Sequence, residues 1–199
     1  MPPFSAEHGA LIISRSIYWN GRLILQEDPG FKGQKTFDCS ITLDAALASQ
    51  DERWRTLIHE ALHACSAGYV RDDFETFRGW EEGVVEKLQR LLRPQILARL
   101  GVNADDEVFR RAEDGHLYNR YLAALEDLQW LTGMSEQEFY VDLLGVPIKA
   151  RIGHVLSLAN AMSGGRRAEF IRTFSKSNAV LKGDARWSLL RLKKNTGNG

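Results

Sequence analysis

The chain has 199 residues, 44% hydrophobic and 26% charged, which is enough to bury a core and excludes a disordered or low-complexity protein. Its two cysteines exclude a disulfide scaffold, and no apolar run approaches the roughly 18 residues of a membrane span. The N-terminus lacks the basic start and apolar core of a signal peptide. We therefore expect a cytoplasmic protein with reduced thiols.

The net charge of zero hides a strong asymmetry along the chain. Residues 1–146 contain 15 Lys/Arg and 24 Asp/Glu, a net charge of −9, whereas residues 147–199 contain 11 and 2, a net charge of +9. The basic quarter could contact nucleic acid, an acidic protein, or the acidic remainder of its own chain. We predict one domain over residues 10–146, with residues 147–199 as a basic helical extension packed on it.

The first part of the chain predicts β-structure. Residues 10–28 are typical of a β-hairpin, because β-branched and aromatic residues flank the turn pair Asn20-Gly21. Residues 28–35 are rich in glycine and predict a loop. Residues 36–44 alternate apolar and polar side chains with a period of two, which indicates a strand.

The remainder of the chain predicts helices. Ser49 and Glu52 form a capping-box pattern before a helix over residues 50–67, whose apolar stripe includes Cys65 as a buried thiol. Residues 68–79 predict a connection, and an acidic loop follows Gly101. The further predicted helices are 80–101 (bent near Pro94), 115–133, 134–147 (capping box Ser135/Glu138), one from Pro147, and shorter ones at 166–177 and 185–194. Strands followed by helices indicate an α+β fold.

The segment 56–65, TLIHEALHAC, contains the motif His-Glu-x-x-His. His59 and His63 lie one turn apart on one helix face, so both imidazoles can bind a single metal ion. Glu60 lies about 100° around the helix, where its carboxylate can take a proton from water held on that metal. The residue types therefore predict a zinc site that activates water.

Catalytic zinc needs a third protein ligand and keeps a fourth position for water. No histidine follows until His116, so the third ligand should be a carboxylate. Glu82 and Glu86 lie four residues apart on the next predicted helix, so one can bind the metal while the other orients a ligand histidine. The remaining nearby candidates are Asp72, Asp73, Glu75 and Glu81.

HEALH, followed after 18 residues by glutamate in the context WEEGVVE, resembles the gluzincin metallopeptidases. The M1 aminopeptidase family is similar in this spacing and in its Glu-Gly-x-x-Glu stretch, and residues 41–64 also resemble small bacterial zincin domains. The resemblance covers residues 36–90. It implies that His59, His63 and Glu82 bind Zn²⁺, that Glu60 is the general base, and that Glu86 supports a ligand.

The resemblance also implies a zincin-like fold, in which the strand at residues 36–44 runs beside the substrate backbone. Gluzincins usually supply a tyrosine or histidine from a later helix to stabilise the oxyanion. Tyr140 is our candidate, and His116, Tyr118 and Tyr121 compete with it.

We therefore predict a minimal zinc metallopeptidase that hydrolyses peptide bonds, with a dedicated intracellular protein as one possible substrate. The alternative is a non-catalytic binding or structural protein in which zinc only holds two helices together. A structural site should be closed by four protein ligands, whereas a catalytic one keeps an open position.

Overall fold

The computed structural model describes residues 18–182. A small sheet comes first, formed by β1 (Leu23–Gln26), β2 (Gly33–Lys35) and β3 (Ile41–Asp44) in the spatial order β1-β3-β2. β3 is the central strand, because β1 pairs with it in parallel and β2 pairs with it in antiparallel register.

The predicted strand at 36–44 overlaps β3, but the loop predicted at 28–35 is wrong for its last three residues, which form β2. Gly33, Gln34 and Lys35 carry no strand pattern, and they are extended because they pair with β3 and lie against α2 (Glu52–Cys65). The first arm of the predicted hairpin falls largely outside the described residues, and β1 itself pairs with β3.

Helices make up most of the rest of the chain, so the fold is mixed α and β and mainly helical. No helix within residues 18–182 is long and apolar enough to cross a bilayer. After α2, the α-helices are α3 (Arg71–Thr76), α4 (Arg78–Arg99), α5 (Asp106–Glu113), α6 (Asn119–Thr132), α7 (Glu136–Gly145), α8 (Arg151–Leu158) and α9 (Gly164–Lys182). Short 3₁₀ turns occupy Ala45–Ser49, Ile148–Ala150 and Ala159–Ala161.

Several predicted helix boundaries differ from the structure. Ser49 ends a 3₁₀ turn, so the first capping box is wrong: Asp51 precedes α2, and Glu52 pairs with Lys32 at 2.6 Å. The second capping box, Ser135 with Glu138, is confirmed. Cys65, expected to be buried, is exposed.

The predicted connection at 68–79 contains α3, and the acidic loop contains α5. α4 continues through Pro94. The helix predicted from Pro147 is instead a 3₁₀ turn followed by α8, and α9 is longer than predicted. The helix predicted at 185–194 lies outside the described residues.

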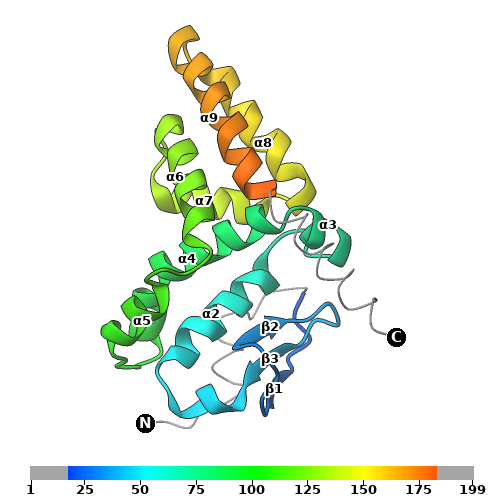
Figure 1. Cartoon of the computed structure of the whole chain (residues 1–199), viewed down its shortest axis with the longest axis vertical. Helices are drawn as coiled ribbons and strands as arrows, with labels where there is room; N and C mark the ends of the chain where they lie inside the picture. The colour runs from blue at the N-terminus through cyan, green and yellow to red at the C-terminus, as the bar shows by residue number, and fades with distance from the viewer. Residues whose placement is uncertain (1–17, 183–199) are drawn as a thin grey trace.

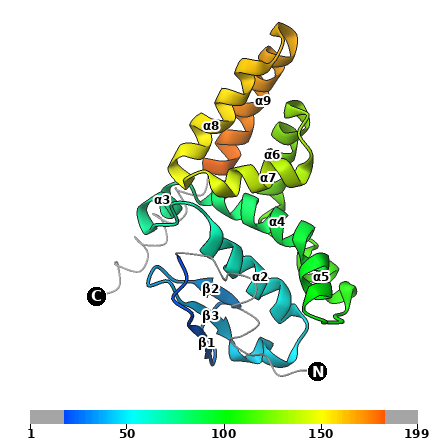
Figure 2. The same ribbon diagram turned by 180° about the vertical axis from the view of Figure 1, so that it is seen from behind.

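The elements stack in layers (Figures 1 and 2). The sheet packs on α2, α2 packs on α4, and α4 contacts α6, α7 and α9. In both views α7 lies on the side of α4 away from α2, and α8 and α9 extend away from the sheet. α2 therefore lies between the sheet and α4, and every residue from Arg53 to Ala64 is buried.

Two glycines let neighbouring helices approach α4 closely. A Cβ at Gly79 would lie 2.3 Å from the carbonyl oxygen of Leu181, and one at Gly83 would lie 2.7 Å from Cδ1 of Leu125. Because the first contact is with backbone, a side chain at Gly79 would force α9 away from α4.

We predict that Gly79→Ala lowers the free energy of unfolding by about 1–3 kcal/mol, the usual cost of overpacking a core. The measurement is urea unfolding followed by circular dichroism. Gly153→Ala is the matched control: Gly153 lies in α8 with open space around it. That substitution should leave stability unchanged or raise it by up to about 1 kcal/mol. Equal effects of the two substitutions would contradict the close approach of α9.

Candidate metal centre

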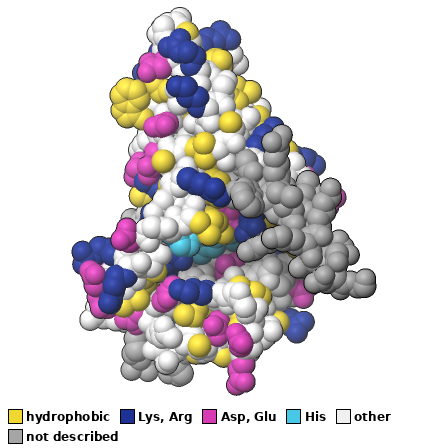
Figure 3. Space-filling view, in the orientation of Figure 1, with side chains coloured by type: hydrophobic (Ala, Val, Ile, Leu, Met, Phe, Trp, Pro, Cys, Tyr) yellow, Lys and Arg dark blue, Asp and Glu magenta, His cyan; other side chains and the backbone are white. Residues whose placement is uncertain are grey.

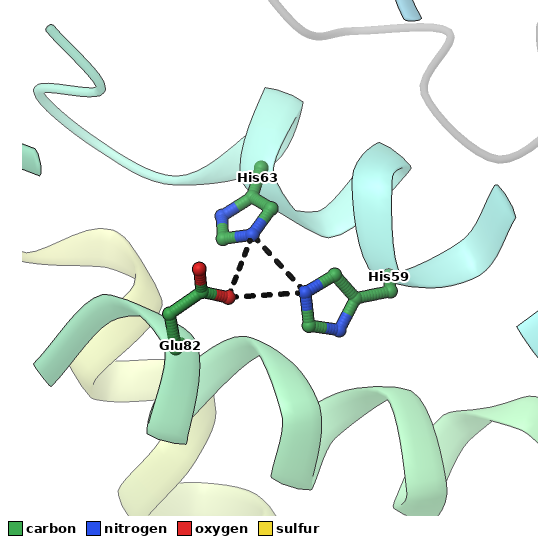
Figure 4. Close-up of side chains that lie close together, drawn as sticks. All are labelled: His59, His63 and Glu82. Carbon is green, nitrogen blue, oxygen red and sulfur yellow. Dashed lines mark hydrogen bonds and ion pairs between the residues drawn. The ribbon is translucent and has the colours of Figure 1, made fainter. Parts of the chain in front are cut away.

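The predicted ligands come together between α2 and α4. Nε2 of His59 lies 3.2 Å from Nε2 of His63 and 3.2 Å from Oε2 of Glu82, and Nε2 of His63 lies 3.3 Å from the same oxygen (Figure 4). All three side chains are buried. They form a group that could hold a metal ion.

A buried carboxylate orients each imidazole through its other nitrogen. Oε2 of Glu86 lies 3.1 Å from Nδ1 of His59, and Oε1 of Glu81 lies 2.8 Å from Nδ1 of His63. An ionised carboxylate only accepts hydrogen bonds, so we infer that each Nδ1 carries a proton and donates it. The Nε2 lone pairs of both histidines then face the centre of the group.

Arginines hold these carboxylates in turn. Glu86 accepts hydrogen bonds from Arg55 at 2.8 Å and from Arg90 at 2.9 Å, and Glu81 accepts one from Arg151 at 2.6 Å. Arg78 donates to Oε1 of Glu82 at 3.3 Å, which leaves Oε2 directed at the histidines. The arginines fix the positions of these carboxylates, and the carboxylates in turn fix the orientation of the histidines.

The electrostatics of the site favour a cation. Burial lowers the pKa of His59, but hydrogen bonds to Glu82 and Glu86 outweigh burial and raise that pKa to about 9. Burial also lowers the pKa of His63, but hydrogen bonds to Glu81 and Glu82 outweigh this effect and raise that pKa to about 10. Burial raises the pKa of Glu86, but His59 and the arginines outweigh it and bring it to about 2.

Protons can occupy this group, but two protonated imidazoles repel each other across it. If both imidazoles are neutral, two nitrogen lone pairs and a carboxylate oxygen face one another. If both are protonated, two N–H donors lie 3.2 Å apart and share Oε2 of Glu82 as their common acceptor in the group. A metal ion at the centre satisfies all three atoms. Tetrahedral zinc, with bonds of about 2.0 Å, separates its ligand atoms by about 3.3 Å, and the residues present fit that spacing.

A cavity of about 220 Å³ opens beside the group, and His59, Glu60 and Tyr118 are among the residues that line it. Figure 3 shows histidine side chains in the middle of this face, between the sheet end of the molecule and the upper helices. Glu60 is held in place because its Oε2 accepts a hydrogen bond of 2.6 Å from the amide of Lys35 in β2. The motif glutamate therefore lines the same space as His59, a member of the candidate ligand group.

Tyr118, and not Tyr140, lies at this cavity. The Tyr118 ring stacks on His59 with centroids 5.9 Å apart, and its hydroxyl interacts with Glu82 and Arg78. Tyr140 is buried on α7 against Phe139, and its hydroxyl has no hydrogen-bond partner among the described residues.

The two other competing residues lie near Tyr118. His116 lines the cavity, and the ring of Tyr121 stacks on Tyr118. Sequence spacing favoured Tyr140 over them, but the packing of α7 on the far side of α4 places Tyr140 away from the histidines.

The strand next to α2 also differs from the expectation drawn from the resemblance. β3, at the predicted position, is the central strand and has no free edge. The edge strand beside Glu60 is β2. Gly33 allows this close approach, since a Cβ there would lie 2.4 Å from Cγ2 of Thr56.

Two parts of the support for the ligands were not identified in the sequence. Glu81 was one of several candidates for the third ligand, and the structure places it behind His63 instead. The signal that could have found it is the adjacent pair Glu81-Glu82, whose side chains point about 100° apart on a helix and can reach different histidines. Arg151 has no sequence signal that separates it from a surface arginine.

Comparison with known proteins gives no further assignment: no protein-family model matches the chain, and no curated protein or solved structure matches it significantly.

We predict that metal affinity rises with pH between 6 and 8. In the metal-free protein the pKa values of His59 and His63 are raised to about 9 and about 10. Both imidazoles are therefore protonated at Nε2 between pH 6 and 8, and a metal must displace one proton from each. Each displaced proton should raise the apparent affinity about tenfold per pH unit. Competition with a chelator of known affinity measures it, and a pH-independent affinity would contradict the assignment.

Proposed function

We propose that the protein is a zinc-dependent peptidase with a gluzincin-like centre in a zincin-like fold. The observation that carries this proposal is the position of Glu60: it follows ligand His59 on α2 and lines the cavity beside the ligand group. A purely structural metal site has no need of a carboxylate in that position.

Zinc is the proposed metal because of the donors and their spacing. Two imidazoles and one carboxylate are typical of catalytic zinc, and separations of 3.2–3.3 Å suit tetrahedral better than octahedral coordination, for which about 3.0 Å is expected. When bound, zinc supplies a Lewis acid that polarises a carbonyl and lowers the pKa of a coordinated water.

Glu60 is the proposed general base. Its carboxylate takes the proton from the attacking water and passes it to the leaving amine. The Lys35 amide holds Oε2 at 2.6 Å and so fixes the carboxylate without neutralising it. This hydrogen bond therefore fixes the proposed base, Glu60, relative to the edge strand β2.

The edge of β2 is the proposed substrate track. The amide of Lys35 points away from β3 and toward Glu60, so the amide and carbonyl of Gly33, two residues earlier, face the same way by strand parity. Gly33 lines the cavity. An extended peptide adding to this edge would bring its backbone past Glu60 and the ligand group.

Tyr118 is the proposed donor to the carbonyl oxygen as negative charge develops on it. Its ring is held against His59, and its hydroxyl lies beside Glu82 at the ligand group. Hydrogen-bond donors fixed in this way stabilise an oxyanion because they need no rearrangement during the reaction.

The structural-zinc alternative is less well supported by the ligand set. A closed structural site needs four protein ligands, and three converge within the described part of the chain. The proposed substrate is a peptide or protein, including a dedicated intracellular protein. An acidic protein or nucleic acid is a proposed partner of the basic C-terminal part.

Glu60→Gln should abolish peptide cleavage, with a loss of about 10²–10⁴-fold, because it removes the proton acceptor. Metal content and melting temperature should be unchanged. His63→Ala and Glu82→Ala should lose both metal and cleavage. The assay is mass spectrometry on a broad peptide library, with metal analysis of each variant. Wild-type protein that binds one equivalent of zinc but cleaves no peptide would favour the structural alternative.

Tyr118→Phe and Tyr140→Phe form a matched pair that tests the site of oxyanion stabilisation. Removing the Tyr118 hydroxyl should lower kcat by about 10²–10³-fold, the usual effect of losing one such donor. Removing the Tyr140 hydroxyl should leave kcat unchanged and stability unchanged or slightly higher, because that buried hydroxyl lacks a hydrogen-bond partner among residues 18–182. Steady-state kinetics on a peptide cleaved by the wild type separates them, and the reverse result would restore Tyr140.

A further inference from the structure

Arg151, the first residue of α8, is fully buried at the back of the metal centre. Its Nη1 donates to Oε2 of Glu81 at 2.6 Å, and its Nη2 donates to Oγ of Ser66 at 2.6 Å. Ser66 in turn donates to the same Glu81 oxygen at 2.8 Å. The guanidinium therefore fixes one oxygen of Glu81 from two directions.

The other oxygen of Glu81 is committed to His63. Oε1 lies 2.8 Å from Nδ1 of that histidine, whose Nε2 belongs to the ligand triangle. With both oxygens held, Glu81 cannot rotate without breaking a charge-assisted hydrogen bond. The chain Arg151–Glu81–His63 thus transmits the position of α8 to a metal-ligating nitrogen.

The two ligand histidines differ in the origin of this support. The arginines behind Glu86, Arg55 and Arg90, belong to α2 and α4, the same helices that supply the ligands. The arginine behind Glu81 comes from the basic part of the chain, 70 residues later in sequence. Among the described residues, the support of His63 therefore depends on α8, whereas that of His59 does not.

Backbone contacts hold the start of this C-terminal part against the end of α2. The amide of Ala67 donates to the carbonyl of Leu144 at 3.0 Å, and the amide of Ile148 donates to the carbonyl of Ala67 at 3.2 Å. Arg151 also donates from Nε to the carbonyl of Val146 at 3.2 Å. The segment that carries Arg151 is thus attached just beyond His63.

We propose that Arg151 is a positioning residue for the metal centre, acting through Glu81 to fix the tautomer and orientation of His63. The basic C-terminal part then completes the site rather than only covering it. The inference rests on the metal-binding part of the proposed function. It goes beyond it because it assigns metal affinity to a residue outside the ligand helices.

The experiment compares Arg151→Met, Arg151→Lys, Glu81→Gln and the double variant Glu81→Gln/Arg151→Met. Arg172→Met, on the exposed face of α9, is the control for loss of a basic charge from the same part of the chain. Zinc affinity is measured by chelator competition at fixed pH, the coordination geometry by the visible spectrum of the Co²⁺-loaded protein, and folding by the melting temperature without metal.

Arg151→Met should be unstable, because it removes the positive charge that pairs with the buried Glu81 carboxylate. The double variant removes both charges and should regain much of the melting temperature. It should still bind zinc about 10–100-fold more weakly than the wild type, with an altered Co²⁺ spectrum, because His63 has lost the carboxylate behind it. Arg151→Lys keeps the positive charge but cannot contact Glu81 and Ser66 through two separate nitrogens, so it should also weaken zinc binding. Arg172→Met should match the wild type.

If the double variant Glu81→Gln/Arg151→Met regained both stability and wild-type zinc affinity, the inference would be overturned. Arg151 would then have a purely structural role. Unchanged affinity and spectrum in a folded Arg151→Lys protein would do the same. Failure of the wild type to bind zinc would instead overturn the proposed function, and this inference with it.

Discussion

The structure depends on one electrostatic constraint: three electron-rich atoms, two imidazole nitrogens and a carboxylate oxygen, are held 3.2–3.3 Å apart in a buried space. Atoms of this kind repel one another unless a positive charge lies between them. Glu81 and Glu86 keep the imidazoles aimed inward, and arginines keep those carboxylates ionised. Three helices, α2, α4 and α8, supply these partners.

This arrangement explains why so many charged groups are buried in a small protein. Glu81, Glu82 and Glu86 are buried on α4, and Arg55 and Arg151 are buried beside them. Buried ion pairs often contribute little to stability, because desolvation offsets their attraction. Their value here lies in geometry, since each pair restricts the rotation of a side chain that contacts the ligand group.

The sequence predicted which side chains converge at the centre better than it predicted their surroundings. Two histidines four apart and a glutamate pair four apart are fixed by helix periodicity, so their convergence follows from two helices packing face to face. The sequence does not predict β2, because Gly33, Gln34 and Lys35 have low strand propensity and are extended through their pairing with β3. The prediction of Tyr140 depends on sequence spacing, and sequence spacing does not determine on which side of α4 the helix α7 packs. Glu81 and Arg151 meet from positions 70 apart, a contact that only tertiary structure defines.

The burial of α2 on all sides has a consequence for how the sequence can change. A typical surface helix has one face on which substitutions are nearly free, but every residue from Arg53 to Ala64 is enclosed by the sheet, by α4 or by neighbouring loops. Selection for folding alone would therefore restrict this helix, including positions that never contact a metal. α9, buried only along the stripe of Phe170, Phe174, Ser177 and Leu181, is free to diverge on its remaining faces. Mutational tolerance should thus fall sharply from the C-terminal helices toward the ligand helix, whatever reaction the protein carries out.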